Sequence, residues 1–411
     1  MISFERFTLS NGLKVLVHED PTTPMAVLNI LYDVGARDEH PEQTGFAHLF
    51  EHLMFGGSKN IPVYDEPLQR VGGENNAFTS NDITNYYISL PATNLETAFW
   101  LESDRMLGLA FSDKSLDVQR NVVCEEFKQR YLNQPYGDVW LKLRPMAYKV
   151  HPYQWATIGK ELAHIEQATM SDVKAFFAKH YHPANAIMVV AGAVKTNDVK
   201  KMTEKWFGDI PKGELNQRKL PVEPVQTEAR KEIVKAKVPL NSIYIAFHMP
   251  ARREDGYYAV DLISDILSRG HSSRLFCTLL KEQKLFSEIN AYVTGSLDAG
   301  LFIVEGKPLP EVSIERAEQA IWSELDKLKN ELVAEDELTK VKNKAESSIV
   351  FSEMSLLDKA MNLAYFELLG DANQVNTEIE KYLEVSAEDI RQQAQQIFRK
   401  ENSSTLYYLA N

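Results

Sequence analysis

The chain has 411 residues, of which 44% are hydrophobic and 25% are charged. This length exceeds what a single hydrophobic core usually organises, so we expect two or more domains. The 45 basic and 58 acidic side chains give a formal net charge of -13, which argues against a general nucleic-acid or anionic-membrane binder. The two cysteines, Cys124 and Cys277, lie far apart and form no disulfide framework. With no apolar signal segment at the start and no stretch of membrane-spanning length, the sequence predicts a cytoplasmic protein.

The first half of the chain predicts a mixture of strands and helices. Alternating hydrophobic residues on both sides of Asn11-Gly12 predict a strand pair, and residues 26–39 predict a third, more buried strand. The stretch TGFAHLFEHLMFGG predicts a helix, with Thr44 as its N-cap and Gly56-Gly57 after its end. Further strands are expected within 75–91 and 185–194, and further helices within 95–111, 116–133 and 170–182.

The segment from Ile210 to Glu232 is polar and contains prolines with little periodicity, which indicates a linker. After it, strands are expected within 241–251, 289–306 and 403–410, and helices within 257–268, 272–284, 313–332 and 334–369. The sequence therefore predicts an α+β fold with two similar domains, each a mostly antiparallel sheet packed with helices. The expected boundaries are 1–212 for the N-terminal domain, 213–232 for the linker and 233–411 for a C-terminal domain without a metal motif.

The most informative stretch is HLFEH, from His48 to His52. On a helix these two histidines lie four residues apart on the same face, where two imidazoles can bind one Zn²⁺. Glu51 can reach the open coordination position without being a ligand, and can take a proton from a water there whose pKa the metal lowers. This is the inverted form of the HExxH zinc-peptidase motif. The alternative is an ordinary surface helix, on which histidine and glutamate are common.

Two histidines do not complete a zinc site, which needs a third protein ligand such as a carboxylate. A second predicted helix, in QRNVVCEEFKQR, carries the adjacent acids Glu125 and Glu126. Their directions differ by about 100° around a helix, so at most one of them faces the metal. Spacing alone leaves both residues open as the ligand, and a solvated acidic face is the competing interpretation.

Several blocks of the sequence resemble, in the same order, those of the pitrilysin-type zinc peptidases, which include insulin-degrading enzyme and the mitochondrial processing peptidase. The blocks are LSNGLKVLVHED, VGARDE, TGFAHLFEHLMFGGS, GGENNAFTSNDITNYY, NVVCEEFKQR, HPYQWATIGK, YHPANAIMVVAG and SSRLF, and they span most of the chain. The resemblance implies a half-length, bacterial-type member with the duplicated fold of this family. It also implies a zinc metalloendopeptidase that hydrolyses extended peptides or unfolded segments in an enclosed chamber formed with a second subunit.

The resemblance also assigns a metal site. It implies one Zn²⁺ per chain, held by His48, His52 and Glu126. In the family the third ligand is a Glu seven positions after another Glu, and here Q-R-N-V-V-C-E-E places Gln119 at the earlier position. Glu125 is then a solvated neighbour. Glu51 is implied to act as the general base and then to pass the proton to the leaving amine.

For substrate binding, the family adds the peptide as a strand to an exposed sheet edge, which gives affinity with loose sequence dependence. The resemblance implies that Asn76 and Ala77, in NNAFT, lie at this edge. Tyr87, at the end of TNYY, matches a tyrosine near the catalytic centre that stabilises the tetrahedral intermediate. Without the resemblance, Asn76 is interpreted as a turn residue and Tyr87 as a core aromatic.

One departure from the family lies in the second half, which in active members supplies an Arg and a Tyr that grip the substrate backbone. Here Leu280 stands at the Arg position and Ser287 at the Tyr position. A one-residue slip would put Phe286 at the Tyr position but supplies no Arg. We therefore expect a dimer, either a heterodimer with a metal-free sister subunit that supplies the missing pair or a homodimer. A non-catalytic structural or assembly subunit and a processing peptidase with one protein client are the alternative functions.

Overall fold

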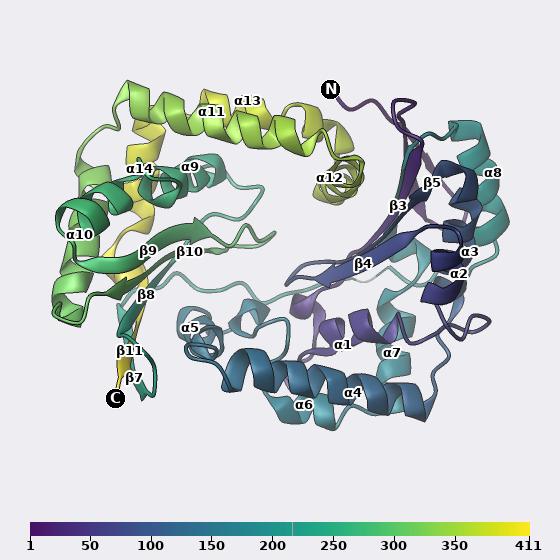
Figure 1. Ribbon diagram of the computed structural model, residues 1–411, viewed down its shortest axis with the longest axis horizontal. Helices are drawn as coiled ribbons and strands as arrows, with labels where there is room; N and C mark the ends of the chain where they lie inside the picture. Colours follow the sequence, from purple (N-terminus) through teal and green to yellow (C-terminus); the bar gives the residue numbers. More distant parts are fainter. Residues whose placement is uncertain (216) are drawn as a thin grey trace. The chain divides into compact units, whose positions relative to one another are not determined.

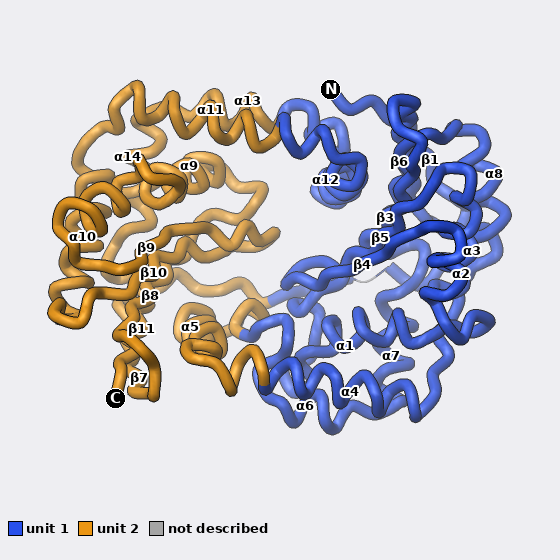
Figure 2. The backbone as a smooth tube through the Cα atoms, viewed as in Figure 1, with its two compact units in different colours: residues 1–128, 155–220, 350–377 blue, residues 129–154, 221–349, 378–411 orange. Residues whose placement is uncertain are grey.

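The computed structural model describes residues 1–215 and 217–411, which form two compact units. Unit 1, blue in Figure 2, contains residues 1–128, 155–220 and 350–377, and unit 2, orange, contains residues 129–154, 221–349 and 378–411. The predicted α+β class with two helix-packed sheets is confirmed. The two units do not coincide with the predicted domains 1–212 and 233–411. Residues 129–154, predicted in the first domain, pack in unit 2, and residues 350–377, predicted in the second domain, pack in unit 1.

Unit 1 is built on a six-stranded sheet in the order β1-β2-β6-β3-β5-β4 (Figure 1). Neighbouring strands are antiparallel except β2 and β6, which are parallel. The central strands β3 and β6 are buried along nearly their whole length, as expected for strands covered on both faces. The strands of this sheet are β1 (Glu5–Thr8), β2 (Lys14–Glu19), β3 (Met25–Tyr32), β4 (Glu74–Thr79), β5 (Thr84–Pro91) and β6 (Ala186–Gly192).

The two edges of this sheet differ. At one edge, the strand pair predicted around Asn11-Gly12 is confirmed as the antiparallel pair β1–β2, and Gly12 takes a φ of 89°, which glycine adopts without strain. At the other edge, β4 has one neighbour in the described part of the chain, β5, and its exposure alternates along the strand. The sheet of unit 1 is therefore open along β4.

Helices cover both faces of this sheet. In Figure 1, helix α12 lies on one side of β3, and it contacts β3 and β6. Helices α3 and α8 lie on the other side, where α3 contacts β3 and α8 contacts β2. Helix α4 continues into a π-helical turn, Lys128–Leu132. The helices of unit 1 are α1 (Phe46–Leu53), α2 (Asp65–Arg70), α3 (Leu95–Leu107), α4 (Asp113–Phe127), α6 (Leu162–Glu166), α7 (Met170–His180), α8 (Thr196–Phe207) and α12 (Leu356–Leu369).

Unit 2 is built on a five-stranded sheet in the order β7-β11-β8-β10-β9, in which β7 and β11 are parallel and the other neighbours antiparallel. The rings of Phe247 and Phe302 both pack edge to face against Phe398 in its core. Its strands are β7 (Arg230–Ala236), β8 (Ser242–His248), β9 (Phe286–Val293), β10 (Leu301–Pro308) and β11 (Ser403–Ala410). Its helices are α5 (Val139–Ala147), α9 (Tyr257–Ser268), the π-helical Leu275–Glu282, α10 (Ile314–Asn330), most of α11 (Glu335–Ser352), α13 (Glu378–Glu384) and α14 (Ala387–Ile397).

The single helix predicted over 334–369 is wrong in its continuity. The chain forms α11 (Glu335–Ser352) and then α12, separated by a turn. Ser355 is the N-cap of α12, because its hydroxyl accepts a hydrogen bond from the backbone N–H of Asp358. The sequence signal for this break is the Ser-x-x-Asp spacing, a helix-start pattern inside an otherwise helical stretch.

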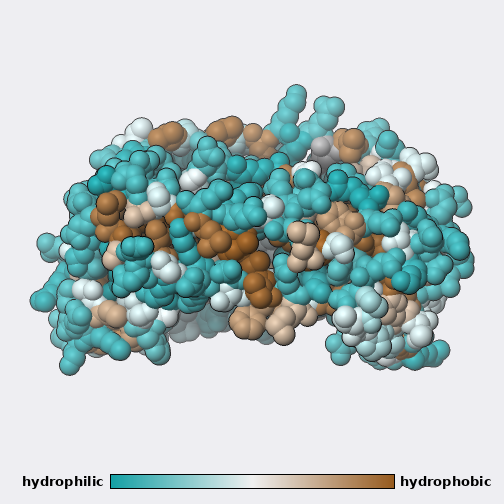
Figure 3. Space-filling model, turned by 90° about the horizontal axis from the view of Figure 1, so that it is seen from above, coloured by the Kyte–Doolittle hydropathy of each residue, from teal (hydrophilic) through white to brown (hydrophobic). Residues whose placement is uncertain are grey.

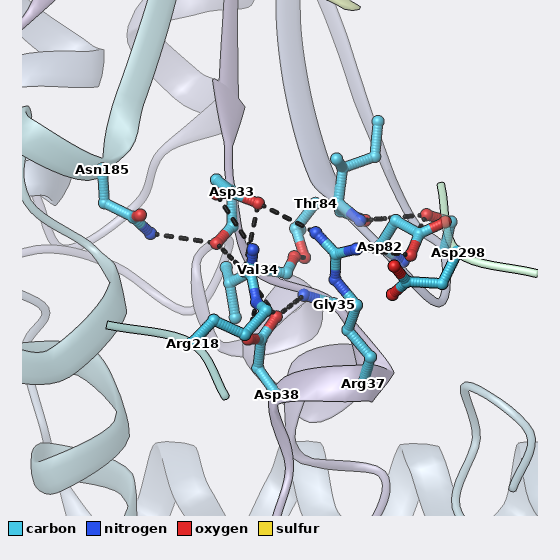
Figure 4. Close-up of polar contacts among 12 residues, drawn as sticks. Asp33, Val34, Gly35, Arg37, Asp38, Asp82, Thr84, Asn185, Arg218 and Asp298 are labelled. Atoms are coloured by element: carbon cyan, nitrogen blue, oxygen red, sulfur yellow. Dashed lines mark hydrogen bonds and ion pairs between the residues drawn. The ribbon is translucent and has the colours of Figure 1, made fainter. Parts of the chain in front are cut away.

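The predicted linker is anchored within each unit. In unit 1, Arg218 donates hydrogen bonds to Asp33 and Asp38, at distances of 2.6 to 3.2 Å (Figure 4). In unit 2, the carboxylate of Glu223 accepts hydrogen bonds from the three consecutive backbone N–H groups of residues 149–151. Two charged side chains in the middle of this polar segment therefore hold it, one to each unit.

No helix among the residues that the structure describes is long and apolar enough to cross a membrane. The face drawn in Figure 3 is mostly hydrophilic, with small hydrophobic areas between polar and charged side chains. Exposed hydrophobic side chains include Phe351 and Met354, beside the turn between α11 and α12.

His180, the last residue of α7, is a buried titratable group in unit 1. Among the residues that the structure describes, neither of its ring nitrogens has a hydrogen-bond partner, and its ring centroid lies 4.6 Å from that of Phe176. Burial lowers the pKa of His180 to about 3. The unfolded chain accepts a proton on this residue below a pKa of 6.5, whereas the folded chain does not until about 3. The free energy of unfolding must therefore fall as the pH falls through this range.

We expect His180→Phe to remove this acid sensitivity. Between about pH 7 and pH 5, the wild type should lose about 2 kcal/mol of unfolding free energy relative to the variant, because the wild-type residue takes a proton only when unfolded. Urea unfolding at both pH values measures the difference. His271→Phe, at an exposed histidine, is the matched control for the change of side chain. Equal pH dependence in the wild type and His180→Phe would contradict the prediction.

Candidate metal centre

Helix α1 carries the HLFEH motif and is held in unit 1 by its apolar residues. Five of its eight residues are buried and hydrophobic, namely Phe46, Ala47, Leu49, Phe50 and Leu53. The other three, His48, Glu51 and His52, are partly exposed. The helical periodicity of the sequence thus separates the residues that pack from the polar residues of the site.

A buried carboxylate satisfies the start of α1. Gly45 is the N-cap, with a φ of 87° and no capping side chain of its own, so the predicted N-cap Thr44 is wrong by one residue. Glu39 accepts hydrogen bonds from the backbone N–H groups of Gly45 (2.9 Å) and Ala47 (2.8 Å), as a capping side chain would. Burial raises the pKa of Glu39 to about 8, against the effect of these two donors. The Thr44 hydroxyl lies instead 2.9 Å from Nδ1 of His164.

Helix α4 brings a carboxylate to the two histidines of α1. Oε2 of Glu126 lies 3.7 Å from Nε2 of His48 and 3.4 Å from Nε2 of His52. Its neighbour Glu125 is exposed and forms an ion pair of 2.8 Å with Lys128 on the surface. Of the two acids that spacing left open, the fold therefore directs Glu126 toward the histidines.

The three side chains can hold a metal ion. One ligand atom from each of His48, His52 and Glu126 lies within 4.8 Å of the other two. Tetrahedral zinc ligands at about 2.0–2.1 Å from the metal lie about 3.4 Å apart, so the distances of 3.4 and 3.7 Å to the carboxylate fit with small adjustments. Two imidazoles and one carboxylate suit zinc better than a hard cation such as Mg²⁺. A fourth position would remain for water or substrate.

Glu51 lies on α1 one turn after His48, so both residues project from the same side of the helix. Its carboxylate accepts a hydrogen bond of 2.6 Å from the hydroxyl of Thr79, the last residue of β4. Thr79 belongs to the NNAFT stretch, but no sequence motif assigns it a role. The available signal is strand alternation, since Thr79 lies two residues after Ala77 and therefore on the same face of β4.

The structure places Asn76 and Ala77 on the open edge strand, as the resemblance implies. The side-chain oxygen of Asn76 accepts a hydrogen bond of 2.8 Å from the N–H of Ala77. Asn76 stands opposite Tyr87 in the β4–β5 pair, so their side chains share one face of the sheet, while Thr79 belongs to the other. Tyr87 therefore lies beside Asn76 and not beside Thr79, the partner of Glu51. Its role at the catalytic centre stays a prediction.

The positions that the resemblance singled out in unit 2 have ordinary structural roles. Leu280 packs against the hydrophobic core of unit 2, and Phe286 is part of that core. Ser287 is exposed and donates a hydrogen bond of 3.0 Å to the carbonyl of Lys307. If the alignment with the family is shifted by one residue, the aromatic side chain at the expected Tyr position is Phe286, which is buried in this core and cannot take the place of an exposed tyrosine.

The inverted-motif zinc peptidases share this arrangement. It consists of two histidines one helical turn apart, an acid between them and a carboxylate from a second helix. Residues 14–159 match the family described as Insulinase (Peptidase family M16), and residues 167–345 match the Peptidase M16 inactive domain. The chain is 30% identical to zinc protease PqqE of Helicobacter pylori, over 98% of this chain and 92% of that protein. The chain therefore belongs to peptidase family M16.

Other relatives and solved structures agree with this assignment. The chain is 24% identical to the uncharacterized zinc protease YmxG of Bacillus subtilis, over 98% of this chain and 97% of that protein. A crystal structure of a protease from Helicobacter pylori matches 99% of this chain and 100% of its own with a TM-score of 0.92 and 29% identity. The periplasmic protease PqqL from Escherichia coli has a TM-score of 0.82 at 18% identity, and this chain covers 48% of it. The predicted half-length type is confirmed.

We expect the protein to bind one zinc ion per chain through the three converging side chains. His52→Ala and Glu126→Gln should each weaken zinc binding by more than about 100-fold, because loss of a ligand exceeds the cost of losing a supporting residue. Glu125→Gln, at the exposed neighbour on the same helix, is the matched control and should keep the metal. Zinc content after dialysis and calorimetric titration measure this. Retention in Glu126→Gln with loss in Glu125→Gln would contradict the assignment.

We expect Glu39→Ala to lower the free energy of unfolding by at least about 2 kcal/mol, because it leaves two buried N–H groups at the start of α1 without an acceptor. Zinc affinity should fall as well, since the same helix carries both histidines. Glu42→Ala removes an exposed acid from the same loop and should change stability little. Urea unfolding gives the comparison, and equal stability of the two variants would rule out the capping role.

Proposed function

We propose that this chain is a zinc metalloendopeptidase that hydrolyses extended peptides or unfolded segments. The observation that carries the proposal is the convergence of ligand atoms from His48, His52 and Glu126 within 4.8 Å of one another. Glu51 lies on the same helix as the histidines and is not one of these ligands. A purely structural metal site has no need of such an acid, whereas a hydrolytic site needs a proton acceptor beside the metal.

A bound zinc ion would lower the pKa of a coordinated water and polarise the scissile carbonyl. In the proposed mechanism, Glu51 takes a proton from the attacking water and then delivers it to the departing amine. The amine therefore leaves as a neutral group. The resemblance assigns Tyr87 to the negative charge that develops on the carbonyl oxygen, but its side chain lies on the other face of the β4–β5 pair from Thr79, the partner of Glu51, so this role is not part of the proposal.

Substrate is proposed to bind as an added strand along β4, with main-chain hydrogen bonds at Asn76 and Ala77. Because the Asn76 side chain accepts from the Ala77 N–H, it must give up this bond for a peptide carbonyl to take its place. A folded domain offers no extended segment for this pairing. The site would thus select flexible peptides rather than a particular sequence.

We propose further that the active form is a dimer that encloses the site in a chamber. Leu280 and Ser287 supply no Arg or Tyr for the substrate backbone, so the missing pair would come from a metal-free sister subunit. A homodimer is the competing arrangement. The predicted cytoplasmic location stays a prediction, and one similar structure is of a protein described as periplasmic.

A non-catalytic assembly subunit is the second candidate function. It is favoured by the absent Arg/Tyr pair and by the match of residues 167–345 to a domain described as inactive. The first proposal is preferred, because an assembly subunit does not require the His48, Glu51 and His52 arrangement to be intact.

We expect the zinc-loaded protein to cleave a quenched library of unstructured peptides, and Glu51→Gln to slow cleavage by at least about 100-fold by removing the proton acceptor. Glu125→Gln is the matched control and should keep full activity. Peptide fluorescence and product mass spectrometry measure the rates. Cleavage by the chain alone would remove the need for a sister subunit. A folded, zinc-loaded chain that cleaves nothing, alone or with a captured partner, would support the non-catalytic candidate.

A further inference from the structure

Thr79 joins strand β4 directly to the acid of the HLFEH motif. Its hydroxyl donates a hydrogen bond to Oε2 of Glu51 at 2.6 Å, in a partly buried position. A hydroxyl-to-carboxylate bond is charge-assisted and stronger than a bond between neutral groups. Such a bond restricts rotation of the carboxylate, so it also sets the direction of Oε1.

Thr79 is itself held firmly by its neighbours. It stands opposite Thr84 at the last position of the β4–β5 pair. The turn that follows is closed by Ser80, whose hydroxyl accepts hydrogen bonds from the N–H groups of Asp82 and Ile83. Because threonine is branched at Cβ, its side chain has few accessible rotamers on a strand. The hydroxyl is therefore presented from a defined position.

The same turn is fastened to the loop that precedes α1. Arg37 forms ion pairs with Asp33 (3.2 Å) and with Asp82 (3.1 Å), as Figure 4 shows. The backbone N–H groups of residues 36 and 37 donate to the carbonyl groups of residues 80 and 81. The loop that leads to the zinc-binding helix and the turn that presents Thr79 thus form one hydrogen-bonded unit.

We propose that Thr79 is the positioning residue for the proton acceptor Glu51. It holds the carboxylate in the orientation that accepts a proton from water, and it ties this orientation to the strand along which the peptide lies. The inference rests on the proposed function. Ala77 and Thr79 lie two residues apart on β4. The same short stretch of backbone therefore positions both the peptide, paired at Ala77, and the proton acceptor, held by Thr79.

The competing explanation is that Thr79 only helps α1 to pack on the sheet. The two explanations differ in what they predict for variants without the hydroxyl. Thr79→Val keeps the shape and branching of the side chain, Thr79→Ser keeps the hydroxyl, and Thr79→Ala provides a second hydroxyl-free variant should Thr79→Val fold poorly. Thr93→Val, at an exposed position of the same unit, controls for the chemical change itself.

The experiment uses the full zinc-loaded chain and measures zinc content, kcat, KM and the affinity for a peptide hydroxamate by calorimetry. A hydroxamate binds zinc and meets the carboxylate beside it without turnover, so it reports the orientation of Glu51 independently of catalysis. In Thr79→Val we expect kcat to fall about 10- to 100-fold, KM to stay within about twofold, zinc content to be unchanged and hydroxamate affinity to fall about tenfold. Thr79→Ser should keep most of both properties, and Thr93→Val all of them.

Wild-type kcat and hydroxamate affinity in Thr79→Val would overturn the inference. Losses in Thr79→Ser without losses in Thr79→Val would overturn it too, because they would indicate packing of the methyl group. If the wild type binds zinc but cleaves no peptide, even with a captured partner, the proposed function fails while the hydroxamate comparison still decides the inference. A tenfold loss of affinity then supports it, and equal affinity overturns it. A folded wild type without zinc overturns both.

Discussion

The hydrogen bonds from the N–H groups of Gly45 and Ala47 to Glu39 determine where α1 begins. The first N–H groups of any helix lack partners within the helix, and here they are buried, so an acceptor must be supplied. The apolar residues that α1 buries determine which of its faces carries His48 and His52. Glu126 reaches these two histidines from another helix. The helix that presents both histidines therefore depends at its start on a carboxylate that is not one of the three candidate ligands.

The loop of residues 33–39 links this cap to the rest of unit 1. Its acidic side chains hold Arg218 of the predicted linker, and its Arg37 holds the turn after β4 through Asp82 (Figure 4). One short loop thus connects three segments that are distant in the sequence. Because α1 and the end of β4 are both bonded to it, the two histidines of α1 and the residue that contacts Glu51 are positioned relative to a common element.

Much of this site could be predicted from the sequence, because HLFEH depends only on helical spacing. The sequence pattern alone cannot choose between Glu125 and Glu126, because it does not show which face of α4 points toward α1. The choice needed either the family resemblance or the structure of α4. Glu39 could not be identified as the cap, because its partners are set by the folding of a loop with a left-handed Gly45. The break before Ser355 was predictable in principle from its capping spacing, but apolar periodicity continues on both sides of it.

Gln119 stands where the family resemblance places a glutamate. It lies seven residues before Glu126 on α4, which is about two turns, so the two side chains face the same way about 10 Å apart along the axis. Charges separated by this distance near a partly exposed surface interact weakly at physiological ionic strength. Exchange of a carboxylate for an amide at this position therefore changes the field at the metal ligands only modestly. Leu280 and Ser287 differ in kind, because the resemblance places at their positions an Arg and a Tyr that touch the substrate, and no distant charge can replace a missing hydrogen-bond donor.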